Sequence, residues 1–142
     1  MADAGLPFKL ITPTGVVFDD NVQEVTAENP IGEFGVLPQH INYLTSLVPC
    51  VITVKLADGG YRFFVVSGGL AEVKDGVMTV LASTAEEAEA LMDGDTASRG
   101  LVAAEERLQN VSFYEPGYQN AVKAAQLARA RQRAVQMRGA AR

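Results

Sequence analysis

The sequence predicts an α+β protein in two parts: a β-sandwich of about ten strands over residues 1–86, then an antiparallel two-helix hairpin over residues 87–142. Two patterns indicate this division. From Phe8 to Leu81, short runs rich in Val, Ile, Thr, Phe and Tyr alternate with turn residues, as in sandwiches and barrels. After Leu81 the composition changes to Ala, Glu, Leu, Arg and Gln, which favour helices.

Charge follows the same division. Residues 1–98 hold 4 basic and 14 acidic side chains, a net charge of −10, whereas residues 99–142 hold 8 basic and 3 acidic side chains, a net charge of +5. Such a division suggests two units that face different partners. No apolar run approaches the ~18–20 residues that span a bilayer, and the N-terminus lacks the features of a signal peptide. We therefore expect a cytosolic or peripheral protein.

Two β-hairpins are predicted from glycine-containing turns between β-type runs. They join Cys50–Leu56 to Tyr61–Val66, and Leu70–Val73 to Val77–Leu81. Residues 63–66 are apolar at every position, so their strand should be central and covered on both faces, by a second sheet or by a partner chain.

Three single residues have structural interpretations of their own. Cys50 begins a stretch in which apolar residues recur at alternate positions, and it has no His or acidic neighbour in sequence. This favours core filling over redox or nucleophilic chemistry. Gly68 and Gly69 stand between the two predicted hairpins, where they indicate a bulge or bend.

The predicted helical hairpin has stripes of small apolar residues. The first helix should run from about Thr96 to Asn110, after a break and an N-cap in residues 93–96. Its stripe consists of Leu101, Ala104, Leu108 and Val111. The second helix should run from about Tyr118 to Arg138, with Ala121, Ala125, Ala128 and Val135 along one side. Alanine buries little apolar area, so the pattern predicts a hairpin that can detach.

Residues 32–40 read Gly-Glu-Phe-Gly-Val-Leu-Pro-Gln-His and contain two glycines, a proline and the single histidine of the chain. Glycine permits positive φ and proline fixes φ, so this segment should hold one particular shape. No nucleophile or second metal ligand stands nearby in sequence, and no catalytic residue is predicted. The plainer alternative is a structured connection between strands, with local hydrogen bonds at Glu33 and His40.

This segment, followed by Leu44 and Thr45, resembles the signature loop of the epsilon subunit of bacterial rotary ATP synthases. Residues 66–73 and 80–85 are similar to strands of the first domain of that family, and the resemblance covers roughly residues 7–90. One departure is Asn42, because the family usually has a proline two residues after the histidine.

The resemblance implies a non-catalytic rotor subunit of a proton-translocating, F-type ATP synthase. Such a subunit joins the gamma subunit to the membrane c-ring and inhibits ATP hydrolysis through its C-terminal helices. It would be peripheral on the cytoplasmic face of the bacterial inner membrane, with membrane contact only through the complex. Whether the helices are docked on the sandwich or extended stays open, as does the source.

The resemblance also implies two sets of contact residues. The set that would meet the c-ring is Gly32, Glu33, Phe34, Pro38 and His40. The set that would face acidic side chains of the alpha and beta catalytic subunits is Arg129, Arg131 and Arg133. A solvated helix face is the alternative for these arginines. No aromatic residues are interleaved with them, which argues against a nucleic-acid partner.

Some family members bind ATP through Asp-x-x-Arg-Ala at the start of the first helix. Here Asp95 and Arg99 are four residues apart instead of three, and Gly100 stands where Ala is usual. This departure argues against nucleotide binding, so no cofactor is expected. A different class of function also stays open, a small β-sandwich that binds ligands or peptides and has a helical oligomerisation tail. The lack of Trp and the 7% aromatic content disfavour it.

Overall fold

A computed structural model of the chain describes residues 5–91 and 93–140. These residues form nine strands, one short 3-10 helix and two α-helices. In chain order the elements are β1 (Leu6–Thr12), β2 (Gly15–Asn29), β3 (Gly32–Val36), β4 (Tyr43–Leu47), β5 (Cys50–Leu56), β6 (Tyr61–Val66), β7 (Gly69–Lys74), β8 (Val77–Ala82), β9 (Ala85–Glu87), the 3-10 helix Ala88–Ala90, α1 (Gly94–Gln109) and α2 (Tyr118–Ala140).

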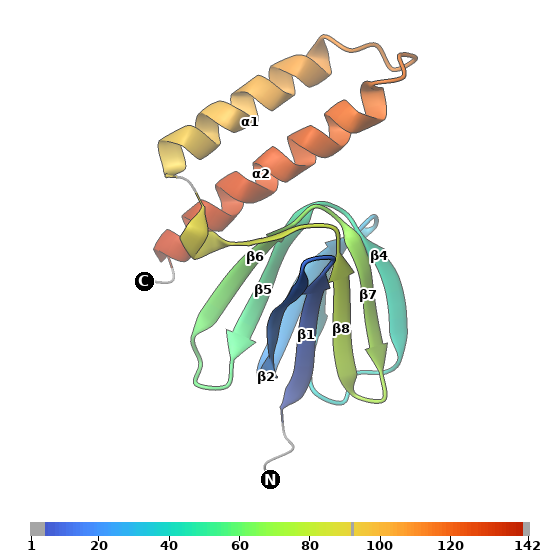
Figure 1. Cartoon of the computed structure of the whole chain (residues 1–142), viewed down its shortest axis with the longest axis vertical. Helices are drawn as coiled ribbons and strands as arrows, with labels where there is room; N and C mark the ends of the chain where they lie inside the picture. The colour runs from blue at the N-terminus through green and yellow to red at the C-terminus, as the bar shows by residue number, and fades with distance from the viewer. Residues whose placement is uncertain (1–4, 92, 141–142) are drawn as a thin grey trace.

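The predicted sandwich is confirmed, and the long strand β2 joins its two layers (Figure 1). The strand order is β4-β7-β8-β1-β2-β5-β6-β9, and β3 pairs with β2 beside this path. β2 pairs with β1 along its first half and with β3 and β5 along its second half, after a register shift between Val22 and Glu24. All pairs are antiparallel except β1 with β8.

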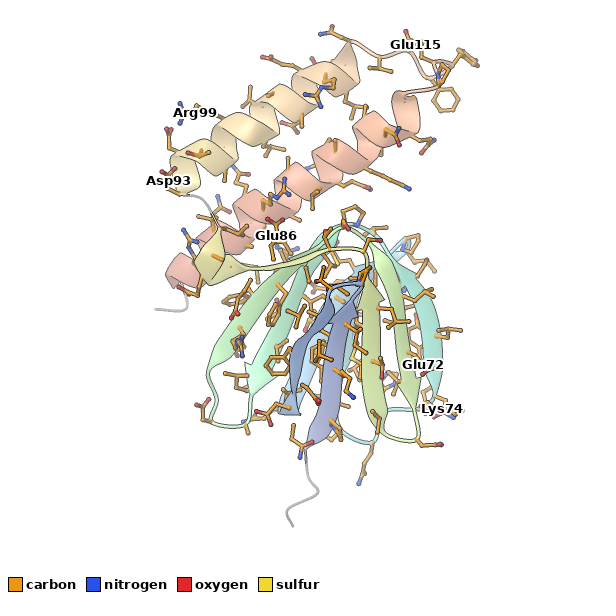
Figure 2. All side chains as sticks on the ribbon, viewed as in Figure 1. Glu72, Lys74, Glu86, Asp93, Arg99 and Glu115 are labelled. Atoms are coloured by element: carbon orange, nitrogen blue, oxygen red, sulfur yellow. The ribbon has the colours of Figure 1, made fainter. Side chains whose placement is uncertain are left out.

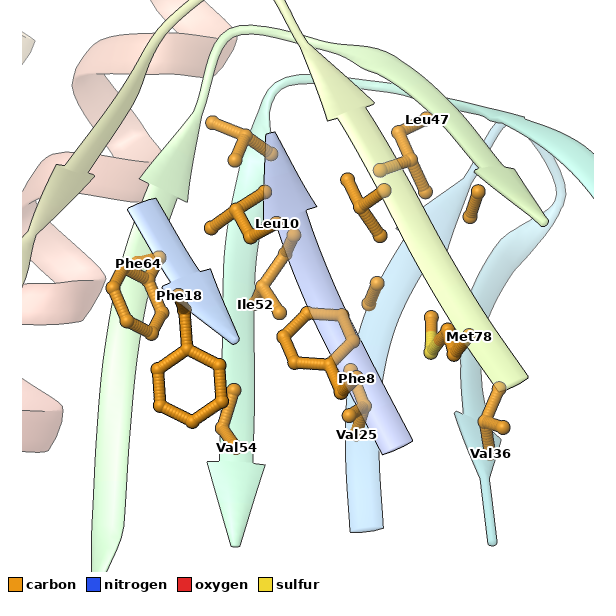
Figure 3. Close-up of a cluster of buried hydrophobic side chains, with 14 of the residues drawn as sticks. Phe8, Leu10, Phe18, Val25, Val36, Leu47, Ile52, Val54, Phe64 and Met78 are labelled. Carbon is orange, nitrogen blue, oxygen red and sulfur yellow. The ribbon is translucent and has the colours of Figure 1, made fainter. Parts of the chain in front are cut away.

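Large apolar side chains from both layers meet between the sheets (Figure 3). The ring of Phe18 lies 5.7 Å from that of Phe8 and 5.8 Å from that of Phe64, and both of those rings are buried. Cys50 belongs to the same core, as predicted, and burial raises the pKa of its thiol to about 11.

Both predicted β-hairpins form. β5 pairs with β6 from Cys50↔Val66 to Lys55↔Tyr61, and β7 pairs with β8 around a turn at Asp75 and Gly76, which have φ of 51° and 80°. The bend expected at Gly68 and Gly69 is also present, with φ of 116° and 147°. A Cβ atom at Gly69 would overlap the carbonyl oxygen of Leu81, so only glycine fits there.

The helices differ slightly from their predicted bounds. α1 begins two residues before Thr96, because the carboxylate of Asp93 accepts a hydrogen bond from the Thr96 amide (2.8 Å) and caps the helix. This bonding to the amide lowers the pKa of Asp93. α2 continues two residues beyond Arg138. No helix in the described part of the chain is long and apolar enough to cross a bilayer.

α2 lies between α1 and the sandwich, so it buries two faces instead of the single stripe predicted (Figure 1). Ala121 and Ala125 are buried as expected, whereas Ala128 and Val135 are only partly buried. The prediction missed the sandwich-facing alanines, Ala130 and Ala134. A helix covered on opposite sides cannot be recognised from one apolar stripe.

α2 also explains the doubly apolar strand β6. Phe64 and Val66 point into the sandwich core, whereas Phe63 and Val65 point outward and pack against α2. The strand is therefore covered on both faces as predicted, but the outer cover is neither a second sheet nor a partner chain. It is the chain's own second helix.

The arrangement predicts that the sandwich folds without the hairpin, because its main core lies within residues 6–85. A chain ending at Leu91 should keep one cooperative thermal transition. Uncovering Val51, Phe63 and Val65 should lower its solubility. A matched truncated chain with Phe63→Thr should recover solubility. Circular dichroism and calorimetry give the test, and a broad, non-cooperative transition in both truncated chains would refute the two-domain division.

Candidate functional site

The turn between β2 and β3 is held by one side chain. The Asn29 carboxamide oxygen accepts hydrogen bonds from the amides of Ile31 (2.9 Å) and Gly32 (3.0 Å), and its nitrogen donates to the Tyr43 hydroxyl (3.1 Å). Phe34 packs edge-on against the Tyr43 ring at 5.7 Å. β3 pairs only with β2, so one of its edges is unpaired within the described residues.

The loop after β3 is shaped by its own backbone. Gln39 has a φ of 66°, and the His40 amide donates to the Leu37 carbonyl (3.2 Å). The His40 imidazole Nδ1 lies 2.7 Å from the Ile41 carbonyl oxygen, and its ring lies 6.1 Å from that of Tyr43. The contacts of His40 are therefore local. Pro38 is partly buried beside it.

Glu33 and His40 lie at opposite ends of β3. Glu33 is near the start of the strand, whereas His40 follows its end, and the three steps from Glu33 to Val36 alone span about 10 Å. No described contact joins the two side chains. Glu33 instead approaches the second helix, with its Oε2 atom 3.5 Å from Nη2 of Arg133.

The three arginines assigned to the catalytic subunits have different partners here. Arg129 pairs with Glu105 of α1 (3.3 Å) and therefore joins the two helices. Arg131 contacts Glu86 of β9 (2.9 Å), which Figure 2 shows between the sandwich and α2. Arg133 reaches Glu28 of β2 (3.3 Å) and Glu33 of β3 (3.5 Å). These side chains therefore do not form one stripe, and two of the three bind the sandwich.

Two further polar contacts hold the ends of the helices. The Arg138 guanidinium donates to the carbonyls of Ala88 and of Leu91 (3.1 Å), in the segment that connects the sandwich to α1. Gln132 of α2 donates to the Ser98 hydroxyl of α1 (3.0 Å).

Asp95 and Arg99 form an exposed ion pair near the start of α1, where Figure 2 labels Arg99. Their charged groups are 3.2 Å apart, and their side chains are 80% and 72% exposed. A cavity of about 380 Å³ lies between the helices, and neither residue lines it. Arg107 and Arg131 do line it, together with small side chains. Among the described residues, no three His, Cys, Asp or Glu side chains gather in a way that suits a metal ion.

An exposed apolar patch that the sequence analysis missed lies on β4, β7 and β8. It consists of Leu44, Leu70 and Leu81, which are 67%, 49% and 50% exposed. These leucines border a shallow cavity of about 150 Å³ together with Glu72 and Thr79. A signal was available in the sequence, because Val80 and Leu81 are adjacent and therefore place apolar side chains on both faces of β8.

Comparison with known proteins agrees with this architecture. Residues 5–88 match the family model described as the beta-sandwich domain of the ATP synthase delta/epsilon chain. The chain is 38% identical over 112 residues to the ATP synthase epsilon chain of Exiguobacterium sp., covering 79% of this chain and 82% of that one. It is 40% identical over 109 residues to that of Nitratidesulfovibrio vulgaris, covering 77% and 80%.

A solved structure extends the similarity to the helices. A chain in the Euglena gracilis mitochondrial ATP synthase assembly of OSCP, F1 and c-ring has a TM-score of 0.80 at 25% identity, covering 93% of this chain and 82% of that chain. A chain of the Tetrahymena thermophila mitochondrial ATP synthase central stalk and c-ring, at 14% identity and a TM-score of 0.61, shares the fold. The sandwich, the hairpin and these relatives together show that the chain belongs to the ATP synthase epsilon-chain family.

Proposed function

We propose that this chain works as a rotor subunit in the central stalk of a proton-translocating ATP synthase, where it joins the gamma subunit to the c-ring and restrains ATP hydrolysis through α1 and α2. The observation that carries the proposal is a sandwich with its own buried core and a separate hairpin, docked through a small apolar contact and ion pairs. As an ATP synthase epsilon chain it is a non-catalytic subunit. It would sit at the cytoplasmic face of a bacterial inner membrane.

The leucine patch is the surface that we assign to gamma. Leu44, Leu70 and Leu81 form an apolar area on the sandwich, on strands that α2 does not cover. A contiguous exposed apolar patch suits a lasting protein contact. Gamma would thus be held through the sandwich, and the helices would stay free to move.

The unpaired edge of β3 and the loop after it are the surface that we assign to the c-ring. This region offers the exposed carboxylate of Glu33, the imidazole of His40 and the ordered loop residues between them. A carboxylate accepts hydrogen bonds and an imidazole can donate or accept, which suits polar loop tips of a ring. The contact would extend along β3, since the two side chains are not together.

Extension of the hairpin would supply the restraint on hydrolysis. Docked α2 fully buries only Ala130 and Ala134 against the sandwich, while Leu127 and Met137 stay partly exposed, so docked and extended states should differ by only a few kcal/mol, a range in which a partner shifts populations. In the extended state Arg129, Arg131 and Arg133 would reach acidic side chains of the catalytic subunits. We include no ATP in this mechanism, because neither Asp95 nor Arg99 lines the interhelical cavity.

The ring contact predicts a loss of attachment on substitution. In the complex, Glu33→Ala with His40→Ala should weaken association with the membrane sector at least about tenfold, since a hydrogen bond accepted by the Glu33 carboxylate alone contributes about 1.5–3 kcal/mol. His40→Ala alone separates this effect from the hairpin, because His40 does not touch α2. Co-sedimentation with ring-containing membranes measures it. Wild-type association of the double variant would exclude these side chains from the contact.

The restraint predicts a release of hydrolysis on truncation. A complex assembled with a chain ending at Leu91 should hydrolyse ATP several-fold faster than the intact complex, because the arginines of α2 are gone, while ATP synthesis continues. Charge reversal of Arg129, Arg131 and Arg133 should give part of this increase. Lys123→Glu is the matched control, because Lys123 is an exposed cation of α2 with no described partner. Equal or slower hydrolysis at equal assembly would assign the helices another role.

A further inference from the structure

Two carboxylates face one arginine where α2 meets the sandwich. Glu28 and Glu33 are directly opposite each other in the β2–β3 pair. Arg133 of α2 approaches both, with Nη1 3.3 Å from Glu28 Oε2 and Nη2 3.5 Å from Glu33 Oε2. We call these three residues the Arg133 clasp. Like charges directly across an antiparallel pair repel, and a guanidinium between them relieves that repulsion.

The clasp lies where the apolar packing is incomplete. A cavity of about 180 Å³ separates α2 from the sandwich beside Arg133, and Glu28, Cys50 and Arg129 also line it. On α2, Ala130 and Ala134 are buried against the sandwich, and the larger side chains of Leu127 and Met137 pack there only partly buried. The ion pairs of Arg133 add to this limited apolar contact.

The clasp joins segments about one hundred residues apart in the sequence, and it cannot survive departure of the hairpin. Arg129 differs, because its partner Glu105 belongs to α1 and moves with the hairpin. If α2 leaves, Glu28 and Glu33 become adjacent carboxylates without their guanidinium. Undocking is thus opposed both by the lost attraction and by the restored repulsion.

We propose that Glu28 and Glu33 compete with the acidic partner of α2 for the guanidinium of Arg133. They hold Arg133 on the sandwich, and the hairpin extends when another acidic surface takes over that guanidinium. The proposal rests on the proposed function, in which extended arginines meet acidic side chains, and it adds what keeps them away. The strength of the restraint on hydrolysis is then set from within the sandwich, by residues that never touch the catalytic subunits.

The isolated full-length chain allows a direct test. Ala134 of α2 is fully buried against the sandwich, so a thiol introduced by Ala134→Cys is labelled only when the hairpin undocks, and mass spectrometry distinguishes it from Cys50. Glu28→Gln with Glu33→Gln should raise the labelling rate about two- to fivefold, the effect expected for partly exposed ion pairs. Glu28→Lys with Glu33→Lys should raise it more, and adding Arg133→Glu to the lysine variant should restore it to within about twofold of the original.

Matched controls exclude a general effect of charge. Glu72→Gln and Glu72→Lys make the corresponding single changes on β7, on a part of the sandwich far from α2 (Figure 2), and should leave the labelling rate unchanged. Circular dichroism confirms that each sandwich is folded. About 1 M salt, where the Debye length is ~3 Å, should speed labelling of the chain with intact Glu28 and Glu33 more than that of the glutamine variant.

Wild-type labelling in the glutamine and lysine variants would overturn the clasp, as would an equal effect of Glu72→Lys. Hydrolysis by the complex then separates this proposal from the proposed function. If labelling rises as expected while hydrolysis does not fall, the clasp stands and the restraint on hydrolysis is wrong. If labelling is unchanged, the clasp is wrong whatever hydrolysis does.

Discussion

The apolar outer face of β5 and β6 is the constraint on which the arrangement of this chain depends. Val51, Phe63 and Val65 are only 5%, 7% and 0% exposed, because α2 lies over them. On α2 the buried partners are Ala130 and Ala134, which allow close approach but contribute little apolar area, and Leu127 and Met137 are only partly buried beside them. The outer face of β5 and β6 therefore has to be shielded from water, yet α2 shields it through a contact that contributes little free energy. This one surface thus accounts for a sandwich that has its own core and for a helical hairpin that can undock from it.

Ion pairs between α2 and the sandwich add to the small apolar contact between them. The acidic first part of the sequence and its basic last part attract each other in the docked state, through Arg131 with Glu86 and through the Arg133 clasp. The division of charge therefore stabilises a contact within the chain itself, in addition to any contact with another protein. Surface ion pairs are weak one by one, so they can be exchanged for similar pairs with another protein. A hairpin held in this way suits a subunit whose helices change partners.

Most of the fold was predictable, because local signals specify it. Turn residues predicted both β-hairpins, the alternation of apolar and polar residues predicted the core side chains, and the glycine pair that includes Gly69 predicted the bend. Tertiary contacts between distant segments were not predictable. Nothing in the sequence near Glu33 indicates that Arg133 lies beside it, and the surplus apolar residues of β6 indicated a cover without identifying α2. The sequence therefore predicted which residues belong to the candidate site, but not which side chains contact one another there.

One distance measurement tests most directly whether the hairpin exchanges partners. Spin labels on Gln136→Cys of α2 and Ala57→Cys of the β5–β6 turn are specific, because Cys50 is buried and its thiol has a pKa of about 11. Pulsed electron resonance on the isolated chain should give one short distance, and the complex during ATP hydrolysis should add a second, clearly longer population. A single unchanged distance in the complex under every condition would contradict a hairpin that leaves the sandwich.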